Sequence, residues 1–245
     1  MTISLSAEPI WHIGTFPVTN TLITSWITVA ILIIAALVLK RHLREKPRGL
    51  QNVAEAVVGG ILNLMDGVTG SREMSKKFFP LIATLFLFIA TANWLGLLPG
   101  FGPIGIYEVH EGKEVLVPFF RSTNSDLNVT LALAIISVVA TQIFGIALIG
   151  AVKYSRRFFN FKNPIFTFVG ILELFSEVAK LISFSFRLFG NVFAGEVLLV
   201  VIAGLIPYVV PLPFYFLEIF VGFIQAFVFA ILTLVFLKVA TVESH

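Results

Sequence analysis

The chain has 245 residues, of which 58% are hydrophobic and only 13% are charged, and its mean hydropathy is +0.97. Soluble domains carry about 25% charged residues, so this composition excludes a conventional soluble protein and predicts one embedded in a membrane. The sequence contains no cysteine, which excludes disulfides, thiolate metal sites and cysteine nucleophiles. The net charge of +3 indicates membrane topology rather than a nucleic-acid partner.

The first apolar segment, residues 22–39, carries no charge and would form a helix about 27 Å long, close to the ~30 Å hydrocarbon core of a bilayer. Residues 40–77 follow, and apolar residues at helical spacing within them predict an amphipathic helix along the membrane surface. These residues are Val53, Val57, Ile61, Leu64 and Met65. Residues 78–98 and 127–152 are two further predicted crossings, and the first of them ends at a cluster of Pro and Gly residues.

Lys and Arg are unevenly distributed among the predicted loops. Residues 40–77 contain eight of them and residues 153–164 contain four, whereas residues 99–126 contain only Lys113 and Arg121. Basic loops remain in the cytoplasm, so these two basic loops are expected there. The N-terminal residues 1–21 and the loop 99–126 are then expected outside, and the C-terminus inside.

The last two apolar segments, residues 165–206 and 214–238, differ from the others. The first has 42 residues without a proline and would be about 63 Å long, twice the ~30 Å hydrocarbon core. It cannot stand upright, so it must tilt far beyond the usual ~20° or extend into the cytoplasmic interface. The predicted fold is a single-domain, all-α membrane protein of about five crossings plus the surface helix, ending in a long, strongly tilted helical hairpin.

Most polar residues of segment 165–206 lie on one stripe. At ~100° per residue, a sector about 80° wide holds Glu173, Glu177, Lys180, Arg187 and Asn191. Glu196 points about 140° away from Glu173, and in the last segment Glu218 and Gln225 share one face. A charged side chain at bilayer depth costs ~2.5 to 3.5 kcal/mol or more, so these groups indicate contact with water or with a partner charge.

Arg187 lies deepest in its segment, and arginine cannot lose its proton at accessible pH. Two interpretations stay open: an ion pair with Glu218 or Glu196 that joins the last two helices, or a fixed cation for a carboxylate on another chain. Glu196 and Glu218 are candidates for a proton relay or for simple pairing with Arg187. Asn191 and Gln225 are candidates for a hydrated path or for hydrogen bonds between helices.

Four motifs resemble the subunit a family of the F-type ATP synthase. The most specific is LISFSFRLFGNVFAGE, residues 181–196, which contains Arg187. The others are QAFVFAILT at 225–233, DLNVTLALA at 126–134 and NWLGLLP at 93–99. The motifs occur in the order found in the family, and the resemblance covers about residues 21–240.

The resemblance implies two offset aqueous half-channels that lead to a rotating ring of c subunits. Arg187 matches the family's essential arginine, whose implied role is to attract the ionised ring carboxylate and to block protons that would pass without rotation. The positions that match the outer half-channel or its entrance are Asn191, Glu196, Gln225, Asn93 and Asp126. Those that match the cytoplasmic half-channel are Glu173, Ser176 and Lys180. Glu218 stands where some relatives have His, and two close carboxylates tend to share a proton.

The resemblance also implies partners: the c-subunit ring, the b subunits of the peripheral stalk and, indirectly, the F1 catalytic sector. No cofactor is expected, because the sequence has no phosphate-binding loop and its four histidines fall outside the predicted crossings. The coupling ion is expected to be H⁺, and the cell membrane of a bacterium is the expected location, since the N-terminus lacks the composition of a transit peptide. The alternative function is a self-contained secondary transporter or channel, although such proteins usually show internal repeats that this sequence lacks.

Overall fold

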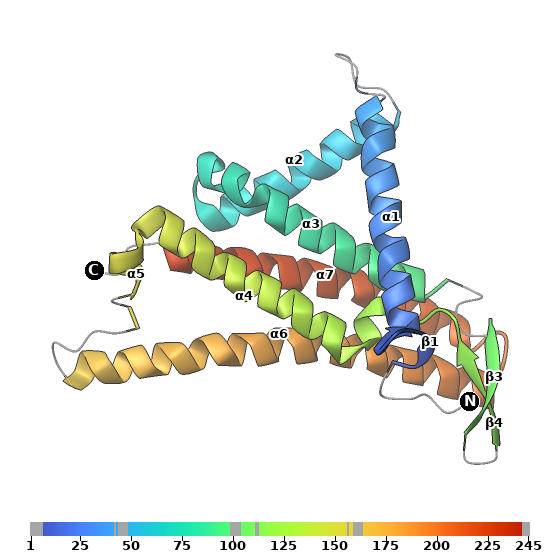
Figure 1. Ribbon diagram of the computed structural model, residues 1–245. Coiled ribbons are helices and arrows are strands. Elements are labelled where there is room, and N and C mark those ends of the chain that lie inside the picture. The colour runs from blue at the N-terminus through green and yellow to red at the C-terminus, as the bar shows by residue number, and fades with distance from the viewer. Residues whose placement is uncertain are drawn as a thin grey trace.

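The computed structural model describes residues 7–41, 43, 49–98, 104–110, 113–155, 157–158 and 164–241 (Figure 1). Within these ranges, seven helices form most of the fold. They are α1 (Asn20–Arg41), α2 (Leu50–Thr69), α3 (Arg72–Gly96), α4 (Leu127–Ile149), α5 (Ala151–Ser155), α6 (Pro164–Leu205) and α7 (Pro211–Thr241). The described part also has a short 3-10 turn, Thr123–Ser125, and four strands: β1 (Pro9–Ile13), β2 (Phe16–Thr19), β3 (Gly105–His110) and β4 (Lys113–Pro118).

Five of the helices, α1, α3, α4, α6 and α7, are long and apolar enough to cross a membrane. The chain is therefore an all-α membrane protein, as its composition predicts. The strands form two small antiparallel hairpins, β1–β2 before α1 and β3–β4 between α3 and α4. The sequence predicts no strands in either place, because each strand has only four to six residues and short apolar runs carry little periodicity.

Prolines and glycines set several helix ends. Pro164 is the first residue of α6 and Pro211 the first of α7, and proline suits this position because its fixed φ is helical and its missing N–H would be unbonded there. Gly150, with φ of +93°, ends α4 and separates it from α5. The helix α3 begins at Arg72, six residues before the apolar run at 78–98. The apolar run misses this start because residues 72–77 are mostly polar.

The core lies where α3, α4, α6 and α7 pack together, and α2 packs on α3 and α7. Phe184 of α6 and Phe229 of α7 stack at its centre, with ring centroids 4.8 Å apart, and Ile89 of α3 is fully buried in the same cluster. A second cluster joins Met65 of α2 to Phe78 of α3 and to the end of α7. These contacts fix α6 against α4 and α7 and fix α3 against α7, and α3, α6 and α7 supply most of the site described below.

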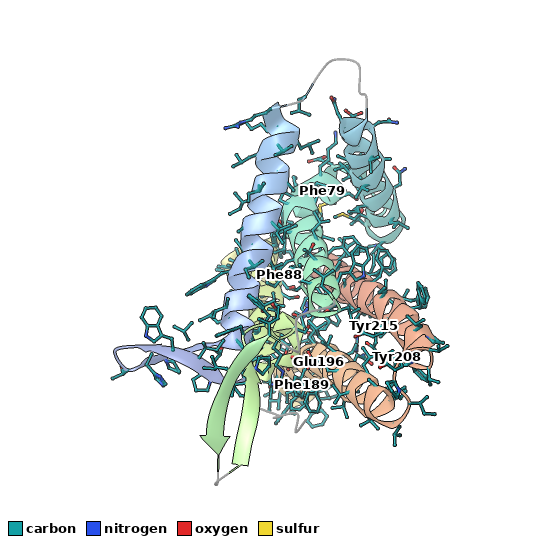
Figure 2. The ribbon with its side chains drawn as sticks, turned by 90° about the vertical axis from the view of Figure 1, so that its right-hand side faces the viewer. Phe79, Phe88, Phe189, Glu196, Tyr208 and Tyr215 are labelled. Atoms are coloured by element: carbon teal, nitrogen blue, oxygen red, sulfur yellow. The ribbon has the colours of Figure 1, made fainter. Side chains whose placement is uncertain are left out.

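Helix α1 stands apart from this core. Figures 1 and 2 show α1 running crosswise to α6, and the second half of α1, toward Arg41, is mostly exposed. Its first turn is anchored: Asn20 and Thr21 are fully buried, and the Thr21 hydroxyl donates a 2.9 Å hydrogen bond to Oδ2 of Asp126. This bond holds the start of α1 to the start of α4.

Candidate functional site

A small cavity with several polar side chains in its wall lies between α3, α6, α7 and the segment that precedes α4. Five residues singled out from the sequence line it: Asn93, Asn191, Glu196, Glu218 and Gln225. The remaining lining residues are Gly96, Leu97, Ser122, Val192, Val221 and Gly222. About 20 Å³ is open to the centres of water molecules, and one water needs ~10–15 Å³. The cavity can therefore hold about one water among two carboxyl and three amide side chains.

The carboxylate of Glu196 is held by the segment 121–126. Arg121 Nε lies 3.4 Å from Glu196 Oε2, and the guanidinium carbon lies 5.9 Å from the ring centroid of Phe193, one turn earlier on α6. Ser122 of the same segment lines the cavity together with Glu196, and the Ser125 hydroxyl donates a 2.9 Å hydrogen bond to the Ser122 carbonyl. Figure 2 shows Glu196 inside the bundle, whereas Tyr208 lies at the far end of the α6–α7 pair.

The sequence alone indicates no role for Arg121, which is one of two basic residues in the loop 99–126. In the structure its side chain is only 9% exposed. The contact with Glu196 joins residues that are 75 positions apart, so no local sequence pattern predicts it. The only local signal is its place at the head of six consecutive polar residues, Arg121–Asp126, all of which are buried.

Segment 121–126 is seated against the end of α3. A Cβ on Gly96 would lie 2.5 Å from Ser122 Cβ, so only a glycine allows this close approach. Asn124 Nδ2 donates a 2.7 Å hydrogen bond to Oδ1 of Asn93. Asn93 thus connects the segment to the cavity wall, and the glycine at 96 lets the backbone come near enough for this bond.

Glu218 reaches the cavity from α7. Its carboxylate lies directly on the backbone of α6 at Gly195, where an added Cβ would meet the carboxylate atoms at 2.1 to 2.3 Å. Two α3 side chains hold this part of α7: Asn93 Nδ2 donates to the Gly222 carbonyl at 2.8 Å and Trp94 Nε1 to the Ile219 carbonyl at 3.1 Å. The register between α3 and α7 therefore fixes where Glu218 stands.

Arg187 lies outside this cavity, on another face of α6. Its Nη2 donates to the Ser183 hydroxyl at 3.1 Å, and its carbonyl accepts from Asn191 Nδ2 at 2.9 Å. In the described part of the chain no carboxylate lies within ion-pair distance of Arg187. The interpretation of an ion pair with Glu218 or Glu196 is therefore wrong for this structure, because Glu196 faces Arg121 and Glu218 lies on Gly195.

Asp126 occupies a structural position rather than a place in the cavity wall. It is buried, and its Oδ1 accepts a 2.9 Å hydrogen bond from the Asn128 backbone N–H, which caps the start of α4. Its Oδ2 accepts the hydroxyl of Thr21. A role at a channel entrance remains a prediction for this residue.

The three residues matched to the cytoplasmic path lie on the first half of α6. Glu173 forms an ion pair with Arg157, and Lys180 forms one with Glu177 at 2.6 Å. The Lys180 ammonium also lies 4.7 Å from the centroid of the Phe236 ring on α7. Ser176 is exposed. The structure thus places these residues together on one helix, but about 35 Å along α6 separates Glu173 from Glu196.

A protein-family model described as ATP synthase A chain matches residues 22–238. The matched residues include the cavity and Arg187, all of α3, α4 and α6, and all of α1 and α7 except the first two residues of α1 and the last three of α7. The chain belongs to this family. It is therefore a subunit of the membrane Fo sector of an F-type ATP synthase, with a part in ATP synthesis and ion transport.

Bacterial relatives agree with the family match. The chain is 38% identical over 220 residues to ATP synthase subunit a of Campylobacter jejuni subsp. jejuni, which covers 88% of each chain. It is 36% identical over 224 residues to ATP synthase subunit a of Geotalea daltonii, covering 90% of this chain and 87% of the relative. ATP synthase subunit a 3 of Pelobacter propionicus is 33% identical over 223 residues, with the same coverage. These relatives and the five apolar helices identify a bacterial multi-pass membrane protein.

Proposed function

We propose that this subunit is the proton-translocating stator of its ATP synthase. In this proposal it supplies two aqueous half-channels and places Arg187 opposite the carboxylates of a rotating c ring. The observation that carries the proposal is the spatial separation along α6: a cavity with polar side chains near Glu196, an ion-pair group near Glu173 and Lys180, and Arg187 between them. Protons that enter one half-channel then need the ring to reach the other.

The cavity is the proposed inner end of the outer half-channel. Glu196 and Glu218 both line it, and neighbouring carboxyl groups pass a proton between them because ionisation of one favours protonation of the other. Gln225 and Asn191 offer amide groups that both donate and accept hydrogen bonds to a water in this space. Asn191 also donates to the carbonyl of Arg187, so the path ends one helical turn from the arginine.

Arg187 is the proposed electrostatic partner of the ring carboxylate. Its side chain is half-buried and its neighbours Ser183 and Phe186 are exposed, so this face of α6 is not covered by the described part of the chain. A guanidinium keeps its charge at every accessible pH and attracts an ionised carboxylate that arrives from another protein. A charge that crosses the membrane field gains ~2.3 kcal/mol per 100 mV, which is enough to bias each rotation step.

The cytoplasmic half-channel is proposed along Glu173, Ser176 and Lys180, where ion pairs keep charged groups on the helix surface. The basic loops favour a cytoplasmic position for this end of α6, and the proposed orientation has the N-terminus outside and the C-terminus inside the cell membrane. The crosswise arrangement of α1 and α6 (Figure 1) supports a strong tilt of the α6–α7 pair. The c ring, the b subunits of the peripheral stalk and the F1 catalytic sector complete the proposed assembly.

The test is Arg187→Ala in the assembled complex, studied in inverted membrane vesicles. ATP-driven acidification should vanish while assembly survives, and the passive proton leak after removal of the catalytic head should remain or grow. Arg72→Ala is the matched control, because Arg72 pairs with Asp66 on the surface of the α2–α3 turn, and it should pump normally. Pumping by Arg187→Ala near the control level would contradict the proposal and favour a self-contained transporter.

A further inference from the structure

In the described part of the chain, Arg121 is the cation that pairs with the half-buried carboxylate of Glu196, and it comes from outside the crossing helices. It precedes the 3-10 turn Thr123–Ser125, and its side chain is 9% exposed where it meets Glu196. An arginine is normally found in water, since burying its charge is costly unless a partner charge compensates. The burial of Arg121 therefore brings a permanent cation into contact with this carboxylate at a cost that the ion pair must offset.

The position of the guanidinium is determined from several sides. It lies between Glu196 and the ring of Phe193, which stand one helical turn apart on α6, at 3.4 Å from the carboxylate and 5.9 Å from the ring centroid. The backbone that carries it is fixed by Gly96, which leaves room for Ser122. The Asn124 to Asn93 hydrogen bond of 2.7 Å holds the same segment on α3. Together, these contacts hold the Arg121–Glu196 ion pair in one defined geometry.

The charged groups of the described chain that face Glu196 are Arg121, from the segment before α4, and Glu218, from α7. The helix α3 contributes the neutral amide of Asn93 to the same cavity. Arg121 favours the ionised form of Glu196, whereas Glu218 in its ionised form opposes it. The balance of these two neighbours determines how readily Glu196 takes a proton from the outer side.

We propose that Arg121 is a positioning residue: its guanidinium orients the Glu196 carboxylate toward the cavity and sets the outer pH at which this group takes up protons. The inference rests on the proposed function, because it assumes that Glu196 receives protons from the outer half-channel. Loss of the cation leaves Glu196 with Glu218 as its charged neighbour. Glu196 then keeps its proton up to a higher outer pH and releases it more slowly toward the ring.

The test uses the assembled complex in proteoliposomes, with the catalytic heads outward, so that the lumen corresponds to the outer side of the cell membrane. ATP synthesis is driven by a fixed membrane potential while the lumenal pH is varied and the external pH is held. Arg121→Gln should raise the lumenal pH of half-maximal synthesis by about 1 unit, the lower end of the effect of a nearby opposite charge, and should lower the maximal rate. Arg121→Lys keeps the charge and should lie close to the wild type.

Two controls separate this effect from general damage. Arg72→Gln breaks an arginine–aspartate pair at the α2–α3 turn, outside both proposed half-channels, and should leave the lumenal midpoint unchanged. Arg121→Met keeps the apolar stem over Phe193 and replaces Arg121→Gln if the latter does not assemble. A lower maximal rate with an unmoved midpoint, or failure of both neutral variants to assemble, would assign Arg121 a purely structural role and overturn the inference.

The same vesicles distinguish failure of the inference from failure of the proposed function. Arg187→Ala should abolish synthesis at every lumenal pH. If it does so while Arg121→Gln leaves the midpoint unchanged, the proposed function stands and the role given to Arg121 is wrong. If Arg187→Ala synthesises ATP normally, the proposed function itself is wrong, and the inference that rests on it falls as well.

Discussion

Replacing Gly195 by alanine should displace the carboxylate of Glu218 while leaving the helices in place. The added Cβ would lie 2.1 Å from Glu218 Oε2, and ordinary contact begins at about 3.4 Å. The nearest oxygen must therefore retreat by about 1.3 Å. Because the obstructing atoms are the far end of a flexible side chain and not backbone, the side chain is what moves, and α6 and α7 remain packed through Phe184 and Phe229.

The expected cost falls on proton transfer and not on folding. Alanine is better than glycine inside a helix by ~1 kcal/mol, and this gain offsets much of the ~1–3 kcal/mol typical of overpacking. A displacement of ~1 Å at a reacting group can lower a rate by about 100-fold. We therefore expect Gly195→Ala to assemble with near-normal stability and to reduce coupled proton flow 10- to 100-fold by the same reasoning.

The assay is ATP-driven acidification of inverted vesicles, normalised to the amount of assembled complex. Gly204→Ala is the matched control, because Gly204 lies on the same helix and a Cβ there meets no atom within 4 Å. Glu218→Asp combined with Gly195→Ala shortens the side chain by about one C–C bond, close to the required retreat, and should restore part of the flow. Normal pumping by Gly195→Ala would refute the reasoning, since the carboxylate position would then be unimportant.

Two further predictions concern stability. Asp126→Ala should lower the free energy of unfolding by about 2 kcal/mol, because it removes the hydrogen bond that caps α4 at Asn128 and the partner of the Thr21 hydroxyl. Chemical denaturation of the solubilised complex measures this loss. Asp126→Asn should lower the free energy of unfolding less, and an equal loss in both variants would argue against capping. The nearby Ser75 hydroxyl and the Arg72 guanidinium, which lies 2.6 Å from Oδ2, hold the pKa of Asp66 below its ordinary value, so the α2–α3 turn should be stabilised at neutral pH and lose this stabilisation as the pH falls below about 4. Hydrogen exchange of the turn amides should show this pH dependence in the wild type and not in Asp66→Asn.

The crossing helices follow from the sequence because hydropathy and length are local properties. A run of about 20 apolar residues must be helical in lipid, where each backbone group needs a partner within the segment. The angular positions on α6 were also predictable from 3.6 residues per turn. Glu196 was expected about 140° from the stripe that holds Arg187, and this angle is why it meets Arg121 from the segment before α4 instead of Arg187.

The details of the cavity depend on contacts between distant residues, which periodicity does not encode. Arg121 reaches Glu196 across 75 positions, and Glu218 lies on Gly195 from the following helix. Gly195 itself gave no sign of its role, because in the sequence it is one of several glycines in a long helix. Asp126 carries a polar side chain in a recognisable motif, but only the structure shows that its oxygens are used by Thr21 and Asn128.

The length and continuity of α6 connect these observations. The helix has 42 residues and is about 63 Å long, so the rise per residue fixes the separation of the groups it carries. Glu173 lies about 21 Å from Arg187 along the axis, and Glu196 about 14 Å on the other side. Neither distance can be crossed by a hydrogen bond of ~3 Å, and Arg187 itself cannot carry a proton away because it does not deprotonate. In the proposed function, a moving carboxylate from another protein connects the two ends of α6, and the uncovered face around Arg187 is the proposed docking surface for that partner.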